Sequence, residues 1–211
     1  TPDFELVEIT TGNLPVFTVD EPYSQQLQAA GGTTPYTWDL TSRFRITQSD
    51  ETFPAFNNEQ VLFDDNSDTI VPVPLGFSFP FFGENYDTVY MHINGHLQFD
   101  HAQLPWPYML EPVLHFRSNR MITPMTNMMF TIALSDNDGG WVEINDTSAT
   151  FRWKLSMAAN PASTEMNFAA RLFANGDIEF LYGDNTLEGL SWLGGISAGN
   201  KKDYVDTPFS G

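Results

Sequence analysis

The sequence consists of short runs in which apolar and polar residues alternate, and turn-forming residues interrupt every run. The clearest run is TFRWKL, in which Phe151, Trp153 and Leu155 alternate with Arg152 and Lys154. Side chains of a β-strand point alternately to its two faces, so this pattern predicts a strand with one buried and one exposed face. No stretch shows a sustained helical period with caps. The chain is therefore predicted to be all-β.

Runs of this kind recur along the chain and are bounded by Gly, Pro, Asn or Asp. The predicted strands are 25–29, 36–40, 61–63, 76–81, 88–93, 96–101, 128–134, 141–144, 149–157, 167–173, 177–182 and 193–198. Short antiparallel strands over 211 residues favour a β-sandwich of jelly-roll or immunoglobulin type with long loops. Prolines 105, 107 and 112 predict that the stretch 101–116 is a long ordered loop or a sheet edge.

An Asn-Gly pair at 175–176 predicts the register of a hairpin. With a three-residue loop, in which Gly takes the left-handed position, Leu172 opposes Ile178 on one face and Arg171 opposes Glu179 on the other. A two-residue loop would instead pair Leu172 with Glu179 and mix apolar with polar side chains. The hydrophobic pattern therefore selects the three-residue loop.

The same element recurs in TVYMHINGHLQF, where two histidines flank the Asn-Gly pair. The same register predicts that Met91 opposes Leu97 on the core face and that His92 directly opposes His96 on the other face. Opposed Cβ atoms lie about 5 Å apart, close enough for two imidazoles to share a transition metal. Such a site needs further ligands, so we favour surface or inter-sheet histidines over a metal site. The polar residues nearby are Tyr90, Gln98 and Asp100.

The composition restricts the possible partners. The chain has 27 Asp and Glu against 9 Lys and Arg, a formal net charge of −18. Such a surface repels phosphate backbones and anionic lipids, so we expect neither nucleic acid binding nor membrane insertion. The absence of cysteine excludes disulfides, thiolate zinc sites and cysteine nucleophiles. No apolar run approaches the roughly 18 residues of a membrane span.

Two acidic segments are candidate calcium sites, and calcium is the only cofactor that we expect. SDNDGGW and FDDNSD each bring several carboxylates together near turn residues, and the second could form a site of its own or half of a shared one. The complete EF-hand loop is absent, and a solvated turn between strands is the alternative. The candidate ligands are Asp136, Asn137, Asp138, Asp64, Asp65 and Asp68.

The segment LPWPYML is a candidate ligand platform. Trp106 and Tyr108 could stack on sugar rings, and Arg117 and Arg120 downstream could add hydrogen-bond donors. The alternative is that these aromatic rings cap one end of the sandwich. Motifs of serine hydrolases, zinc proteases and phosphate-binding loops are absent from the sequence. We therefore do not expect an enzyme, and a hydrolase that uses paired carboxylates remains as an alternative.

Several segments occur in an order that resembles a known family. They are LGFSFPFFGENYDTVYMHINGHLQF, ATFRWKLSM, NFAARLFANGDIEFLYGD and LGGISAGN. Together they are similar to the nidogen-like β-sandwich domains of large secreted and surface-anchored bacterial proteins. The resemblance implies a non-catalytic part of an adhesin or of a multidomain secreted protein, and it brings no catalytic residues with it.

The N-terminal stretch GNLPVFTVDEPYSQQLQAAGGTTPYTWDL resembles the opening half of the immunoglobulin- or cadherin-like repeats of bacterial surface proteins. The second half of such a repeat does not follow. We therefore predict immunoglobulin-like lead-in strands over 1–42, packed on a nidogen-like β-sandwich over 43–211.

We expect a non-catalytic extracellular module of a larger bacterial secreted or surface protein, which acts in adhesion or ligand binding and for which calcium is a candidate stabilising ion. The expected partners are a glycan or protein ligand on a surface and the neighbouring domains of the same chain. The N-terminus shows no signal peptide, so we expect a fragment of a longer protein. The alternative within binding proteins is a carbohydrate-binding module of a multidomain polysaccharide-degrading enzyme.

Overall fold

The computed structural model describes residues 7–12, 24–36, 38, 44–57, 59–64, 70–100, 112–126, 130–131, 138–157, 165–185 and 192–207. The chain divides into two compact units, Thr1–Thr47 and Gln48–Gly211. In the first unit, β1 (Glu8–Ile9) pairs antiparallel with β2 (Ala29–Ala30). The packing of lead-in strands on the main domain stays a prediction.

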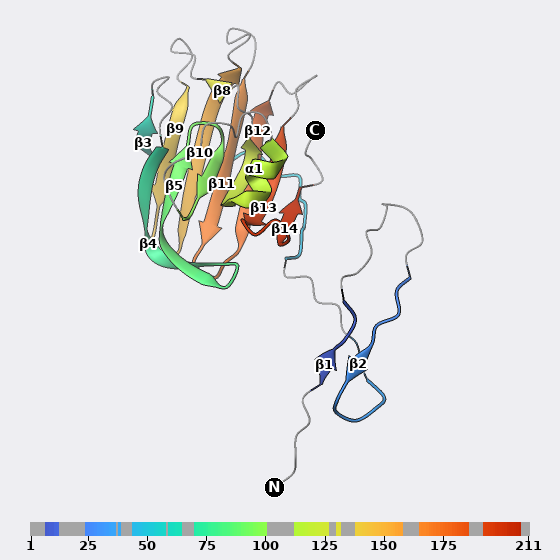
Figure 1. Cartoon of the computed structure of the whole chain (residues 1–211). Helices are drawn as coiled ribbons and strands as arrows, with labels where there is room; N and C mark the ends of the chain where they lie inside the picture. The colour runs from blue at the N-terminus through green and yellow to red at the C-terminus, as the bar shows by residue number, and fades with distance from the viewer. Residues whose placement is uncertain are drawn as a thin grey trace. The chain divides into compact units, whose positions relative to one another are not determined.

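The second unit consists of two antiparallel sheets that face each other (Figure 1). One sheet has the order β12-β11-β10-β9-β3, with β8 beside β10, and the other has the order β14-β13-β7-β6-β5-β4. The strands are β3 (Gln60–Phe63), β4 (Ile70–Phe81), β5 (Glu84–His92), β6 (His96–Gln98), β7 (Arg120–Thr126), β8 (Phe130–Thr131), β9 (Gly139–Ile144), β10 (Ser148–Met157), β11 (Met166–Phe173), β12 (Ile178–Asn185), β13 (Leu193–Ala198) and β14 (Tyr204–Asp206). A single short helix, α1 (Pro112–Ser118), lies in the described part of the chain. The predicted all-β sandwich is confirmed.

The central strand β10 contributes much of the core. Phe151, Trp153 and Leu155 are fully buried, whereas Arg152 and Lys154 are only partly covered. The predicted buried face of this strand is therefore confirmed. A shift of one residue would expose all three apolar side chains, so burial fixes the register.

The register of the β11–β12 hairpin is confirmed. Leu172 pairs with Ile178, and Arg171 pairs with Glu179. The side chains of this second pair form an ion pair with 3.0 Å between Arg171 Nη1 and Glu179 Oε2. Gly176 has a φ of 93°, the left-handed conformation that the three-residue loop requires.

The β5–β6 hairpin also has the predicted register. Met91 pairs with Leu97 and His92 pairs with His96. Gly95 closes the loop with a φ of 84°. Met91 and Leu97 are fully buried, so this hairpin supplies core side chains on one face and the two histidines on the other.

The β4–β5 hairpin differs from the prediction in length. Strand β4 begins at Ile70 and includes Pro72 and Pro74, which the prediction of 76–81 left out. Prolines at alternate positions remove N–H donors from one side of a strand only, and β4 is the edge strand of its sheet among the described residues. Phe82 and Gly83, with φ values of 48° and 87°, form the tight turn to β5.

Several other predictions were wrong in detail. In the stretch 101–116, residues 112–116 belong to α1, because a proline is well accommodated at the first position of a helix. Residues 101–111 lie outside the described residues. Strands β7 and β14 were not predicted, and β6 is shorter than 96–101. Residues 25–28 are not in a strand, and neither are 36 and 38 within the predicted 36–40.

Candidate functional site

A pair of stacked histidines lies at the end of the β5–β6 hairpin. The ring centroids of His92 and His96 are 4.6 Å apart and the ring planes are 9° from parallel. Each side chain is only 2% exposed. A third imidazole, that of His115 on α1, lies with its centroid 6.3 Å from that of His96. The fold therefore brings three imidazoles together from two segments of the chain.

The hydrogen bonds around the pair indicate which ring nitrogens carry protons. The backbone N–H of Asn94 donates to His92 Nδ1 at 3.0 Å, so this nitrogen is an acceptor. Thr126 Oγ1 donates to the Asn94 carbonyl at 2.5 Å and lies 3.4 Å from His96 Nδ1. Because the hydroxyl proton is used, His96 Nδ1 is the donor in this contact. The acceptor role of Nδ1 requires that His92 is neutral in this arrangement, with its proton on Nε2.

Burial keeps the two histidines neutral. Burial, together with the smaller effect of the nearby His115, lowers the pKa of His92 from 6.5 to about 3. Burial also holds the pKa of His96 well below 6.5, again with His92 and His115 acting in the same direction. The charged form is disfavoured because an imidazolium loses its hydration in this setting.

The stacked geometry bears on the metal hypothesis. The lone pair of an imidazole nitrogen lies in the ring plane, so two nearly parallel rings cannot both direct a lone pair at one ion unless a ring turns. In the part of the chain that the structure describes, no group of three or more His, Asp or Glu side chains is arranged to hold a metal ion. A transition metal at His92 and His96 stays a prediction.

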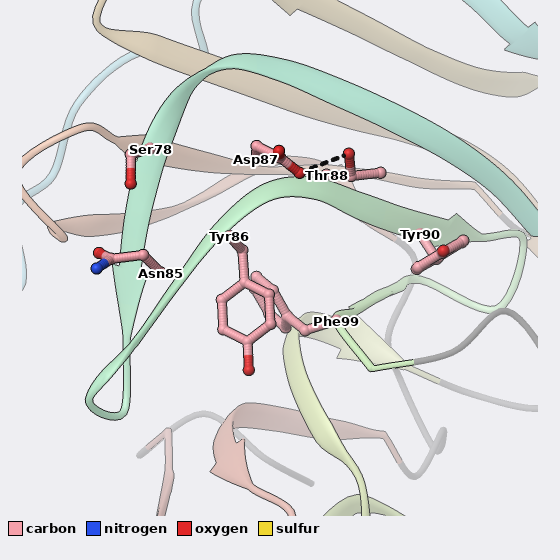
Figure 2. A pocket seen from close by; sticks show the side chains of 7 residues that line it. All are labelled: Ser78, Asn85, Tyr86, Asp87, Thr88, Tyr90 and Phe99. Carbon is pink, nitrogen blue, oxygen red and sulfur yellow. Dashed lines mark hydrogen bonds between the residues drawn. The ribbon is translucent and has the colours of Figure 1, made fainter.

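An open recess of about 570 Å³ lies beside the β4–β5 hairpin (Figure 2). Tyr90, one of its lining residues, pairs with Gln98 and so lies next to the His92–His96 pair on the same hairpin. The lining combines two partly buried tyrosines with short polar side chains. The residues are Ser78, Asn85, Tyr86, Asp87, Thr88, Tyr90 and Phe99.

Tyr86 is held in place from several sides. Its ring centroid lies 4.7 Å from that of buried Phe99. Its hydroxyl donates to Asp100 Oδ1 at 3.3 Å and accepts a hydrogen bond from Arg120 Nη1. Arg120 Nη1 also lies 4.0 Å from Asp100 Oδ1, so the arginine charge is balanced locally. Burial raises the pKa of Tyr86, and the phenol stays protonated.

The structure describes two of the four residues of the predicted ligand platform, Arg117 and Arg120. Arg120 reaches the recess through Tyr86, whereas the guanidinium of Arg117 lies 4.2 Å from the ring centroid of Tyr204 and 3.9 Å from Asp206. The remaining platform residues, Trp106 and Tyr108, lie outside the described residues. Of the two described platform residues, Arg120 bonds to a residue that lines the recess.

The predicted calcium ligands are described only in part. Asp138 is buried and accepts a hydrogen bond of 2.7 Å from Ser156 Oγ, while Asp64 is exposed. The pairing of Phe63 with Gly140 brings Asp64 and Asp138 to the same end of the β3–β9 pair. The other candidates, Asp136, Asn137, Asp65 and Asp68, lie outside the described residues.

Tyr86 and His115 were not predicted as site residues, and Tyr90 was predicted only as a polar neighbour of the histidine pair. The alternating polar face Tyr86-Thr88-Tyr90 was a usable signal, because it continues the face that carries His92. His115 gave no comparable signal, since its contact with His96 joins residues far apart in the sequence.

Comparison with known families identifies the module. A family model described as NIDO related matches residues 43–206, which is most of the chain. The chain belongs to the NIDO-related family. Searches of curated proteins and of solved structures each gave no significant match. The NIDO-related family is a non-enzymatic type of module, and membership suggests a non-catalytic extracellular domain. No helix within the described residues is both long and apolar enough to cross a membrane.

Proposed function

We propose that this NIDO-related module binds a ligand on a surface, as an extracellular part of a larger secreted or cell-surface protein of bacterial type. The recess beside the β4–β5 hairpin is the proposed ligand site. The proposal rests on one observation: two partly buried tyrosines and several short polar side chains line the same open recess. Such a combination offers both apolar contact and orientation to a small ligand.

The proposed ligand is a neutral glycan. Tyr86 and Tyr90 can pack against the C–H faces of sugar rings, and the side chains of Asn85 and Asp87 can bond to ring hydroxyls. Asp87 is oriented by a 3.0 Å hydrogen bond from Thr88 Oγ1, drawn in Figure 2. The net charge of −18 disfavours glycans that carry carboxylates or sulfates.

The role proposed for Arg120 is to position Tyr86. Its guanidinium bonds to the Tyr86 hydroxyl and lies 5.6 Å from the Tyr86 ring centroid. Together with Phe99 beneath the ring, this contact fixes the orientation of the phenol before a ligand arrives. A side chain that is already ordered loses little conformational entropy on binding, which favours affinity.

Binding to a glycan array that carries neutral and acidic glycans tests the proposal. The wild-type chain is expected to bind neutral glycans, and Tyr90→Ala is expected to weaken binding by about tenfold or more. Tyr90→Phe keeps the ring and should retain most of the affinity. Trp38→Ala removes an exposed aromatic ring of the other unit and serves as the matched control.

Three results would count against this site. Wild-type chain that binds no neutral glycan would contradict the ligand class. Binding that survives Tyr90→Ala unchanged would contradict the recess. Binding lost in Trp106→Ala but kept in Tyr90→Ala would move the site to the predicted platform.

The carbohydrate-binding module of a polysaccharide-degrading enzyme is the second candidate, and the same recess supports it. The two candidates differ in the rest of the parent protein, where a neighbouring catalytic domain would favour the second. The hydrolase alternative gains no support from the recess, because Asp87 is the one acidic side chain among its described lining residues.

A further inference from the structure

The turn between β9 and β10 carries an acceptor sequence for N-linked glycosylation. Residues Asn145, Asp146 and Thr147 form an Asn-x-Thr pattern in which the middle residue is not proline. All three residues are exposed. The β4–β5 recess is lined by other residues, so this pattern lies outside the proposed ligand site.

The hydrogen bonds of Asn145 leave room for a substituent on its amide nitrogen. Asn145 Oδ1 accepts bonds from the backbone N–H groups of Thr147 at 3.0 Å and of Ser148 at 2.9 Å. Asn145 Nδ2 donates one proton to Ser148 Oγ at 2.9 Å. A primary amide nitrogen carries two protons, so one remains. A sugar could replace that proton while every one of these hydrogen bonds is retained.

We propose that Asn145 is an N-glycan acceptor. The donor is an oligosaccharide linked to a lipid pyrophosphate. The Asn145 amide nitrogen forms a bond to the anomeric carbon, the bond from that carbon to the pyrophosphate oxygen breaks, and the amide proton passes to a base of the transferase. The lipid pyrophosphate leaves with the electron pair of the broken bond. The inference rests on the extracellular function proposed above, because the transfer occurs on exported chains.

Two other asparagines of the chain provide matched controls. Asn175 Oδ1 accepts a 3.0 Å bond from the backbone N–H of Asp177, and Asn200 Oδ1 accepts one of 3.0 Å from Lys202. Both therefore share with Asn145 a side-chain oxygen that accepts a bond from the backbone N–H two residues later. Neither is followed at the second position by Ser or Thr. Geometry and exposure alone predict modification of all three, whereas the acceptor pattern predicts modification of Asn145 only.

The test is peptide mass spectrometry of the full protein purified from the exported fraction of its own source. The peptide that contains Asn145 is expected to gain the mass of whole hexose and N-acetylhexosamine units, and the peptides that contain Asn175 and Asn200 are expected to be unmodified. Release by peptide-N-glycosidase should convert Asn145 to aspartate. Thr147→Ala should abolish the modification while its backbone N–H still caps the turn, and Thr147→Ser should keep it.

Because a variant that misfolds could also lose the modification, a second variant is designed to gain one. Asp177→Thr gives Asn175 the acceptor pattern and should create a second modified site. Exported protein with an unmodified Asn145 would overturn the inference and leave the proposed binding function intact. Modification that persists in Thr147→Ala would overturn it as well. Protein found only in the cytoplasm, with Asn145 unmodified, would overturn both the extracellular assignment and this inference.

Discussion

The indole Nε1 of Trp153 donates a 2.8 Å hydrogen bond to the backbone carbonyl of His92, and this bond joins the two sheets of the sandwich. The Trp153 ring also stacks on that of Phe168, with the centroids 5.4 Å apart. One residue of β10 thus fills the core and fixes the strand end that carries the histidine pair. The stability of the fold and the geometry of the site are coupled through this contact.

Removing the Trp153 ring is expected to destabilise the chain strongly. Trp153→Ala should lower the free energy of unfolding by about 3–5 kcal/mol, because a fully buried aromatic side chain leaves a large cavity. Trp153→Phe keeps a ring but leaves the His92 carbonyl without this donor, at a cost of about 1–3 kcal/mol. Denaturant unfolding measures both values. Wild-type stability in Trp153→Ala would contradict the inward assignment of β10.

The buried histidines predict a loss of stability on mild acidification. The folded pKa values of His92 and His96 lie below 6.5, so the unfolded chain takes up protons first as the pH falls. Stability is then complete above about pH 6.5 and falls toward about pH 3, with a limiting slope of about 1.4 kcal/mol per pH unit for each histidine. Urea unfolding between pH 7 and about pH 5, above the range where most carboxylates titrate, measures the slope.

A double variant isolates the contribution of the pair. The slope of the unfolding free energy against pH is proportional to the number of protons taken up on unfolding. In the double variant His92→Asn and His96→Asn, this number should fall by up to two, and the slope should decrease accordingly. Absolute stability is not the readout, since the substitutions also alter packing. An unchanged slope in the double variant would show that the pKa values of the two histidines are the same in the folded and unfolded states.

Calcium is predicted to raise the melting temperature. The β3–β9 register brings Asp64 and Asp138 to one end of the sheet, and an ion held between their loops would bind only the folded chain. Melting in millimolar calcium and in chelator should differ for the wild type. The difference should shrink in Asp64→Asn and Asp138→Asn and persist in the exposed control Asp184→Asn. Equal wild-type melting under both conditions would remove the calcium prediction.

The sequence predicted the strand faces and the hairpin registers because those depend on a period of two residues. A shift of one residue would have exposed Leu172 or Met91, so burial alone selects the observed pairing. The opposition of His92 and His96 followed from the same argument. Features without a periodic pattern could not be predicted in this way. Helix α1 has seven residues, too few to show a helical repeat. A proline such as Pro112 is common both at the start of a helix and in a loop, so it does not distinguish the two.

The recess could not be predicted, because it depends on the curvature of one hairpin. The pairing of β4 with β5 shifts between Pro74 and Phe79, where Gly76 has a φ of 77°. Such an irregularity bends a strand and redirects its side chains, and a pattern of alternating residues does not specify its size. The local face of Tyr86 and Tyr90 was readable in the sequence, but the hollow that they line was not.

The two hairpin glycines provide a matched pair with different surroundings. Gly95 and Gly176 have φ values of 84° and 93°, so an alanine at either position suffers a left-handed strain of about 1–2 kcal/mol. A Cβ at Gly95 would also overlap the Met125 carbonyl oxygen, whereas one at Gly176 would lie 3.1 Å from Pro80 Cγ at its nearest contact. Gly95→Ala should therefore cost about 1–3 kcal/mol more than Gly176→Ala in denaturant unfolding, because backbone at Met125 must move. Equal costs would show that the first hairpin does not pack on β7 as closely as the structure places it.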